Sequence, residues 1–218
     1  RSSGGTVLSE DRTTLTYDDS AVAEVTETMA QMVAAGSFPA LAQMQAVETF
    51  AAGELGMILE SSSVQGTFAA GAKAGWQLRA AALPSFGDQP VVPTNSGAAL
   101  YLFAEDPYKQ AAGWELISYL TSPEAYEKIT NGIGYLPLRD GLTEGNGPLA
   151  DWYEQNPLVA PNLKQLAAIE PWVSMPGDNY LQIRDGMMEA VESIVFGGAD
   201  PQSTLQQAAE NGAELMPQ

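Results

Sequence analysis

The residue in this chain best suited to bind an anion is Arg184. It is the only basic residue after Lys164, in a stretch that is otherwise acidic. A guanidinium always carries a positive charge, and its five N–H donors form a planar fork that matches the oxygens of a phosphate or carboxylate. The spacing leaves a second interpretation open, in which Arg184 pairs on the surface with Asp185, Glu189 or another acid.

Three consecutive hydroxyl groups, on Ser61, Ser62 and Ser63, follow a short apolar run. Hydroxyls bind sugar hydroxyls or phosphate oxygens through neutral hydrogen bonds. The alternative role of these serines is a helix N-cap or an ordinary loop. The Asn-Ser-Gly sequence at 95–97 offers related chemistry, because glycine lets backbone N–H groups approach a ligand closely. Its alternative is a simple turn.

Aromatic side chains with a polar atom form the third group of candidates. Tyr135 lies in the glycine-flanked, extended segment 132–138 and could cover a ligand while donating one hydrogen bond, or it could pack in the core. The chain has four tryptophans that could stack on a sugar ring. Trp172, in a loop, is the best of the four, whereas Trp114 falls in the apolar stripe of a helix and is expected in the core.

The composition excludes several classes of chemistry. The chain contains no His and no Cys, which removes His-based catalysis, Ser-His and Cys-His nucleophiles, zinc sites and iron–sulfur clusters. We therefore predict no catalytic residue, no metal and no cofactor. A net charge of −18 argues against nucleic acid as a partner and against docking on an anionic membrane. Carboxylate chemistry remains open, but 27 acidic residues offer too many pairs to identify one.

The elements that must position these residues alternate between helices and strands, which indicates an α/β or α+β class. Capping residues and apolar spacing predict helices near 20–36, 42–53, 107–120, from 123, 147–155, 158–168, 179–196 and from 201. Apolar runs predict a hairpin of 6–8 with 14–17, and strands at 56–60, 77–83 and 98–104. Residues 85–97 read as a linker or crossing segment. No apolar run reaches membrane-spanning length, and residues 1–10 lack the apolar region of a signal peptide.

Four motifs occur in a characteristic order: VETFAAGELGMILESSS at 47–63, AAGWELISYLTSPEAYEK at 111–128, GYLPLR at 134–139 and LQIRDGMMEAVESIVFGG at 181–198. This ordered set resembles the extracellular solute-binding proteins that serve carbohydrate-importing ABC transporters. Within that family, the chain is most similar to the glycerol-3-phosphate-binding branch. The resemblance covers nearly the whole chain.

The resemblance implies particular ligand contacts. Carried over motif by motif, these are Ser62 (with Ser61 and Ser63 as alternatives in register), Gly97, Tyr135 and Arg184. Two departures from the branch are visible, because Ser96 stands where a second glycine is usual and the serine loop lacks an extra glycine.

The resemblance also implies a periplasmic-binding-protein-like fold of type II, α/β in class, of which this chain is an incomplete C-terminal portion. We expect 1–88 to belong to the second lobe, 89–139 to cross to the first lobe, and 140–218 to form the C-terminal helices of the second lobe. Residues 89–139 would then expose apolar side chains such as Leu100, Leu102, Ile117 and Leu120, or repack. A proteolytic remnant or a repacked, oligomeric fragment is therefore expected.

The function implied is that of the substrate-binding component of an ABC importer, not an enzyme. It would bind a glycerol phosphate, a phosphodiester or a sugar by closure of two lobes, and deliver it to the transporter's membrane subunits. The implied location is periplasmic or extracellular, with a lipid anchor in the full-length protein as one arrangement. Two alternatives stay open: a carboxylate-dependent carbohydrate-active enzyme, and a truncated fragment without binding activity.

Overall fold

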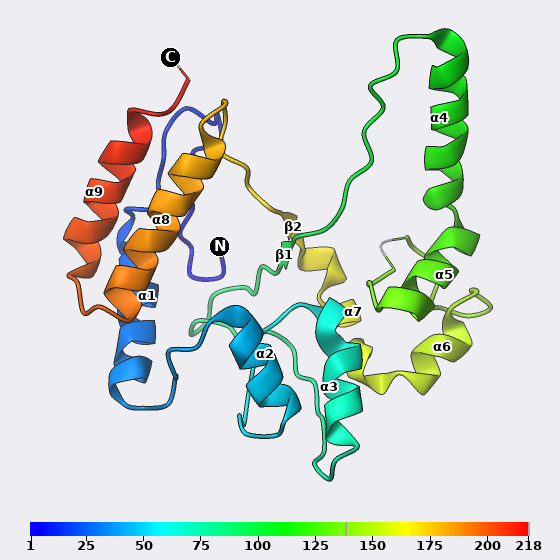
Figure 1. The fold of residues 1–218 in the computed structure, drawn as a ribbon, viewed down its shortest axis with the longest axis horizontal. Coiled ribbons are helices and arrows are strands. Elements are labelled where there is room, and N and C mark those ends of the chain that lie inside the picture. The colour runs from blue at the N-terminus through cyan, green and yellow to red at the C-terminus, as the bar shows by residue number, and fades with distance from the viewer. Residues whose placement is uncertain (138, 218) are drawn as a thin grey trace. The chain divides into compact units, whose positions relative to one another are not determined.

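The computed structural model describes residues 1–137 and 139–217. The chain divides into two compact units, each of which has its own packed helices. Unit 1 consists of Arg1–Leu41, Leu83–Asn95 and Ala168–Gln218, and unit 2 consists of Ala42–Ala82 and Ser96–Ala167. The elements of both units are labelled in Figure 1. The last residue of the predicted extended segment 132–138 lies outside the described residues.

Three helices build unit 1, and they lie side by side in Figure 1: α1 (Ser20–Ala34), α8 (Tyr180–Val195) and α9 (Pro201–Ala213). The Asp19 carboxylate caps α1 by accepting from the Ala21 N–H, and Asp200 caps α9 by accepting from the Ser203 N–H. The buried side chains between the helices form one apolar cluster: Leu8, Leu15, Tyr17, Ala23, Met175, Ile183, Ala190, Ile194, Leu205 and Ala209.

The predicted N-terminal hairpin is confirmed as a short antiparallel bridge between Leu8 and Leu15. Backbone N–H groups of Ser9 and Thr16 donate across it, at 2.9 Å and 3.2 Å. The hairpin leads into Tyr17, whose hydroxyl donates to the Ala208 carbonyl of α9 at 2.9 Å. Burial, with a smaller effect of Asp18, raises the pKa of Tyr17 to about 12. The hairpin therefore closes one side of the core of unit 1.

The only sheet among the described residues is a two-residue parallel pair, β1 (Thr94–Asn95) with β2 (Glu170–Pro171). Backbone bonds extend the pair on both sides, because Glu170 N–H donates to Pro93 O at 2.9 Å and Trp172 N–H donates to Asn95 O at 3.0 Å. This pairing fixes the segment that leads toward α8 against the segment 83–95.

Unit 2 is built from short helices with a small aromatic core. Phe50 contacts Phe68 and Trp76 edge-to-face, with ring centroids 4.7 Å and 5.4 Å apart. Its α-helices are α2 (Gln43–Ala51), α3 (Gln65–Ala72), α4 (Pro107–Leu120), α5 (Pro123–Ile133), α6 (Ala150–Gln155) and α7 (Ala160–Lys164). Shorter 3₁₀ turns are η1 (Ser62–Val64), η2 (Pro157–Val159) and η3 (Leu166–Ala168).

Most predicted helices form, with one change. The helix predicted over 158–168 is divided into η2, α7 and η3. Pro161 lacks the backbone N–H that a continuous helix needs, which accounts for the break between η2 and α7.

The strands predicted at 56–60, 77–83 and 98–104 are wrong, because none of these described residues is in a strand. A strand is stable only when its backbone groups pair with neighbouring strands, and no described segment pairs with these. Met57 and Phe103 are exposed, at 90% and 86%, whereas Ile58 and Leu78 are partly buried against the aromatic core of unit 2.

The prediction that Trp114 lies in the core is also wrong, since its side chain is 63% exposed. All residues of α4 are described and none is buried, so the apolar stripe of this helix is only partly covered. The expected exposure is confirmed for Leu100 and Leu102, at 52% and 41%, but not for Ile117 and Leu120, which are half-buried.

Candidate functional site

A cavity of about 360 Å³ lies in unit 1. Its volume is near the lower end of the roughly 300–1,000 Å³ range of small-molecule sites. Its walls come from the N-terminal loop, α1, the β1–β2 pair and the first turns of α8. The lining residues are Arg1, Ser2, Ser3, Gly5, Thr6, Val7, Val22, Val25, Phe86, Val92, Thr94, Glu170, Pro171, Trp172, Val173, Met175, Tyr180, Arg184 and Met187.

Helix α8 places Arg184 on the cavity wall. Ile183, its neighbour in sequence, is buried in the core of unit 1 with 1% exposure, which fixes the rotation of the helix about its axis. Successive helical residues are about 100° apart, so Arg184 emerges at the edge of that packed face. Tyr180 lies one turn earlier and lines the same cavity.

Asp185 orients the guanidinium of Arg184. Its Oδ1 accepts from Arg184 Nε at 3.0 Å and from Nη2 at 2.6 Å. These bonds hold the pKa of Arg184 above its usual value, so the side chain is always charged. Among the contacts of the described residues, Asp185 uses two of the five guanidinium donors, which leaves three for a ligand. The surface pair of Arg184 with Asp185, which the sequence left open as an alternative, is therefore present. Arg184 nevertheless lines the cavity.

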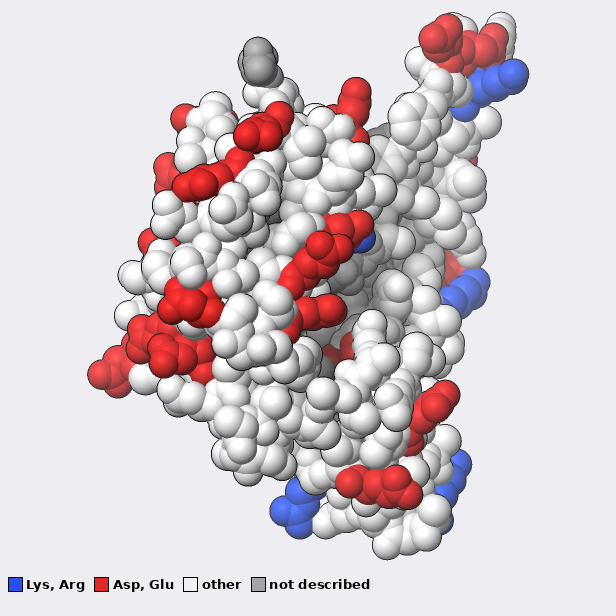
Figure 2. Space-filling view, turned by 60° about the vertical axis from the view of Figure 1, so that its left-hand side comes forward, with Lys and Arg blue, Asp and Glu red and all other residues white. Residues whose placement is uncertain are grey.

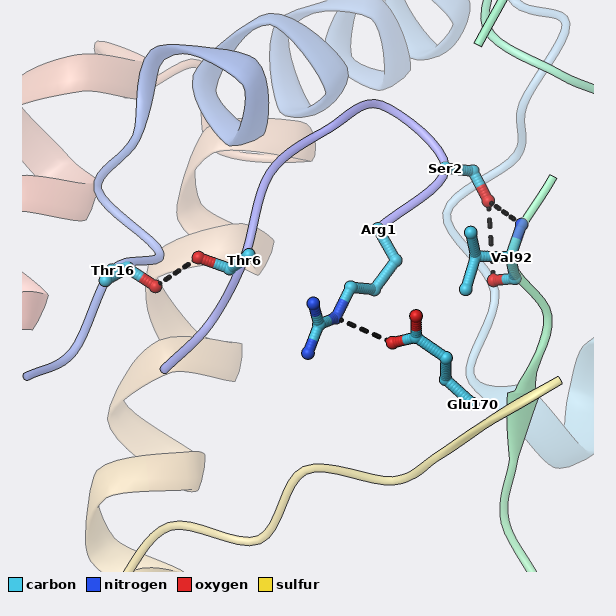
Figure 3. A network of polar contacts seen from close by, with 6 residues as sticks. All are labelled: Arg1, Ser2, Thr6, Thr16, Val92 and Glu170. Carbon is cyan, nitrogen blue, oxygen red and sulfur yellow. Dashed lines mark hydrogen bonds and ion pairs between the residues drawn. The ribbon is translucent and has the colours of Figure 1, made fainter. Parts of the chain in front are cut away.

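A second guanidinium lines the cavity, that of Arg1. Its Nε lies 3.1 Å from Glu170 Oε2, and Figure 3 shows the two side chains pointing toward one another. The adjacent Ser2 hydroxyl holds the N-terminal loop to Val92, donating to its carbonyl at 3.4 Å and accepting from its N–H at 3.0 Å (Figure 3). These contacts attach the loop to the β1–β2 side of the cavity.

Aromatic side chains give the cavity an apolar part. Trp172 follows β2 directly, and its backbone N–H bond to Asn95 holds that residue in place. The Trp172 side chain is 52% exposed, so its ring is accessible to a ligand. Phe86 and Tyr180 also line the cavity. Aromatic faces of this kind contact the carbon skeleton of a polyol or sugar while polar groups bind its oxygens.

The serine loop lies in unit 2, where Ser61 is the N-cap of η1. The Ser61 Oγ accepts from the Ser63 N–H at 3.3 Å and shares a hydroxyl hydrogen bond with Ser63 Oγ at 2.9 Å. The N-cap role that the sequence left open is therefore present. A contact between this loop and a ligand stays a prediction.

Tyr135 also lies in unit 2, close to the serine loop. A Cβ placed on Gly134 would lie 3.7 Å from the Ser62 carbonyl oxygen, so the segment before Tyr135 passes beside the loop. Gly134 has a φ of 72°, the left-handed conformation that ends α5 and turns the chain into this segment. The Tyr135 side chain is 41% exposed, so the alternative of core packing is wrong.

The seven residues singled out from the sequence thus divide into two groups. Arg184 and Trp172 meet on one cavity of unit 1. Ser61, Ser62, Ser63 and Tyr135 gather in unit 2, where Gly97 is exposed just after β1. Each group is internally consistent with a binding surface.

Sequence reasoning missed Arg1, Glu170 and Tyr180 as cavity residues. Tyr180 could have been found from its spacing, four residues before Arg184 on a helix. Glu170 could have been found because alternate residues of an extended segment share a face, and it lies two residues before Trp172. No local signal identifies Arg1, because its position depends on contacts with residues distant in sequence.

Two features are absent from the described residues. Within 1–137 and 139–217, no group of three or more acidic side chains is arranged to hold a metal ion. In the same ranges, none of the helices has the length and apolar character needed to cross a membrane.

Known proteins resemble this chain in sequence. Residues 3–161 match the family described as "Bacterial extracellular solute-binding protein". The sn-glycerol-3-phosphate-binding periplasmic protein UgpB of Brucella abortus (strain 2308) is 30% identical over 177 residues, which are 77% of this chain and 39% of that protein. The protein of the same name from Yersinia pseudotuberculosis serotype I (strain IP32953) is 29% identical over 146 residues, 62% of this chain and 32% of its own length. The chain therefore spans less than half the length of these relatives.

Solved structures show the same fold over almost the whole chain. The cyclic alpha-maltosyl-1,6-maltose binding protein of Arthrobacter globiformis superposes with a TM-score of 0.81 at 20% identity, covering 98% of this chain and 52% of that one. UgpB of Mycobacterium tuberculosis, in complex with glycerophosphocholine, superposes with a TM-score of 0.74 at 19% identity, covering 98% and 53%. The predicted periplasmic-binding-protein-like fold, present in part, is confirmed.

Proposed function

Because the chain belongs to the family of bacterial extracellular solute-binding proteins, we propose that it is a ligand-binding portion of the receptor of an ABC importer. The ligand we propose is a glycerol phosphate or a glycerol phosphodiester. Relatives named for sn-glycerol-3-phosphate, and the neighbour in complex with glycerophosphocholine, support this ligand class.

The observation that carries the proposal is the meeting of Arg184 and Trp172 on one cavity of unit 1. Both were selected from the sequence for different chemical reasons, and they come from different elements. The guanidinium supplies charged donors for phosphate oxygens, and the half-exposed indole supplies a surface for the glycerol carbons. The cavity thus combines an anion-binding group with an apolar wall, which is the composition expected of a small-ligand site.

The remaining predicted contacts concern the complete protein, and they too are part of the proposal. Ser62, with Ser61 and Ser63 as alternatives, the Gly97 backbone and Tyr135 would contact the ligand when two lobes close around it. The receptor would act in the periplasm or outside the cell, held there by a lipid anchor in one arrangement, and would pass its ligand to the membrane subunits without chemical change. The division into 1–88, 89–139 and 140–218 likewise applies to that complete receptor.

Titration calorimetry of the 218-residue chain with glycerol-3-phosphate, glycerophosphocholine and maltose tests the proposal. We expect binding of a phosphate compound, unchanged ligand recovered afterwards, and a loss of about tenfold or more in affinity in Arg184→Ala, because a hydrogen bond to a charged group contributes roughly 1.5–3 kcal/mol. Arg79→Ala is the matched control, since Arg79 lies in unit 2, is exposed and bonds Gln77.

Three outcomes would contradict the proposal in different ways. Maltose binding that does not change in Arg184→Ala would indicate a sugar receptor. A ligand recovered in hydrolysed form would favour the carboxylate-dependent enzyme. Binding of none of the three compounds would indicate a fragment without binding activity.

A further inference from the structure

The unit 1 cavity is unusually rich in arginine for so acidic a protein. Acidic residues outnumber basic ones by 27 to 9 in the chain, and Figure 2 shows acidic side chains spread over one face with few Lys and Arg among them. The charged side chains that line the cavity, however, are two arginines, Arg1 and Arg184, and one acid, Glu170. Asp185, bonded to Arg184, balances the second arginine, so what the cavity offers an anion is two guanidinium groups close together in a protein with only 9 basic residues.

Arg1 is held in a way that leaves donors facing away from its partner. The printed contact with Glu170 is made by Nε, at 3.1 Å, and Figure 3 shows the two terminal nitrogens on the far side of the guanidinium from that carboxylate. The side chains of Arg1 and Glu170 are 41% and 45% exposed, so the pair contributes little to stability. Glu170 therefore orients Arg1 without using all of its hydrogen-bonding capacity.

Arg184 is oriented in the same manner by a different acid. Asp185 Oδ1 binds Nε and Nη2 of Arg184, and the Nη1 amino group is not part of that contact. Each guanidinium on the cavity wall is thus fixed from its Nε side by one carboxylate. Two oriented guanidinium groups on one small cavity match a ligand with more than one negative charge.

From this arrangement we propose that Arg1 is a second anion-binding residue, and that Arg1 and Arg184 together select a phosphate monoester over a phosphodiester. A phosphate monoester carries between about −1.5 and −2 charges at pH 7, whereas a phosphodiester carries one. The second charge gives the monoester an additional favourable interaction that Arg1 is placed to strengthen. This inference rests on the proposed function and makes it more specific, because it ranks sn-glycerol-3-phosphate above glycerol phosphodiesters.

The test compares two ligands that share the glycerol group. The affinities of the 218-residue chain for glycerol-3-phosphate and for glycerophosphoglycerol, a monoanionic diester, are measured by calorimetry at pH 7.5 and constant ionic strength. The wild-type chain is expected to prefer the monoester by about tenfold, and Arg1→Gln to lose about that factor for the monoester and little for the diester. Arg79→Gln is the control for loss of a positive charge outside the cavity.

A second variant keeps the inference testable if Arg1→Gln disturbs the N-terminal loop. In Glu170→Gln the amide oxygen still accepts from Arg1 Nε, but the negative charge of the cavity is gone, so monoester affinity is expected to rise severalfold more than diester affinity. Equal affinities of the wild-type chain for the two ligands, or an equal loss for both in Arg1→Gln, would overturn the role of Arg1 alone. Absence of binding to either phosphate, or binding unchanged in Arg184→Ala, would instead overturn the proposed function itself.

Discussion

The substitution Gly212→Ala in α9 tests how tightly the core of unit 1 is packed. A Cβ at this position would lie 2.7 Å from Leu15 Cδ1, 3.1 Å from Tyr17 Oη and 3.3 Å from Ile183 Cγ2. The first of these distances is too short for two carbon atoms, so the substitution Gly212→Ala requires a movement in the N-terminal hairpin. Tyr17 cannot move freely, because its hydroxyl is bonded to Ala208 O at 2.9 Å.

The expected magnitude follows from two opposing effects. Overpacking in a close-packed core costs about 1–3 kcal/mol. Alanine in place of glycine within a helix stabilises it by roughly 0.5–1 kcal/mol. The net result for Gly212→Ala is a loss of up to about 2 kcal/mol in the free energy of unfolding, even though the substitution improves helix propensity.

Gly186 of α8 provides the matched control. It is also a helical glycine of unit 1, but a Cβ there would meet no atom within 4 Å. Gly186→Ala is therefore expected to gain about 0.5–1 kcal/mol. Urea unfolding followed by circular dichroism measures both variants, and a Gly212→Ala protein as stable as Gly186→Ala would refute the described packing of the hairpin on α9.

Three further predictions address the site, the exposed apolar surface and the core. Asp185→Asn should raise the affinity for a phosphate ligand by up to about fivefold in calorimetry, because the amide oxygen still accepts from Arg184 while no negative charge competes with the phosphate. A weaker complex would show that the charge of Asp185 is needed to hold Arg184 in position. In gel filtration, the chain should associate as its concentration rises, because large exposed apolar groups favour burial. Replacing Phe103 and Trp114 by serine should abolish this association. A wild-type chain that elutes as a monomer at all concentrations would contradict the prediction. Tyr17 should ionise at about pH 12 in an ultraviolet titration, a transition that Tyr17→Phe should remove. Since its pKa is raised in the folded state, the stability it contributes is complete below about pH 10 and lost between pH 10 and 12, and Tyr17→Phe should remove that dependence too.

The helices could be predicted from sequence because their signals are local. Asp19, Ser122 with Pro123, and Asp200 with Pro201 stand next to apolar residues at helical spacing, and the cap bonds form as expected. A helix satisfies its backbone within its own residues, so the prediction does not depend on the rest of the fold.

The predictions of strands were wrong because the stability of a strand depends on residues outside it. An apolar run such as 56–60 or 98–104 indicates burial, but a strand also needs a partner that may be far away in sequence. The described residues supply no such partner, and Met57 and Phe103 are exposed. The apolar pattern therefore indicates a tendency to be buried, but Met57 and Phe103 are not buried by the described residues.

The sequence identified only those site residues that have a local signal. Arg184 could be identified because a single base in an acidic stretch is conspicuous, and Trp172 because it is an aromatic residue in a loop. Arg1 and Glu170 could not, because they meet only through the β1–β2 pair and the bonds between Ser2 and Val92. Such contacts are set by tertiary structure, and neither residue has a distinctive neighbourhood in the sequence.

The proposed function requires that an anionic ligand binds in the unit 1 cavity at Arg184. The most direct measurement is a nuclear magnetic resonance titration of the ¹⁵N-labelled chain with sn-glycerol-3-phosphate, in which the Nε–H signals of the arginines are followed and assigned by single Arg→Lys variants. We expect a saturable shift of the Arg184 signal, while the signals of Arg79 and Arg139, both in unit 2, serve as internal references and stay in place. Saturable binding that leaves the Arg184 signal unchanged would show that the ligand does not bind at this residue.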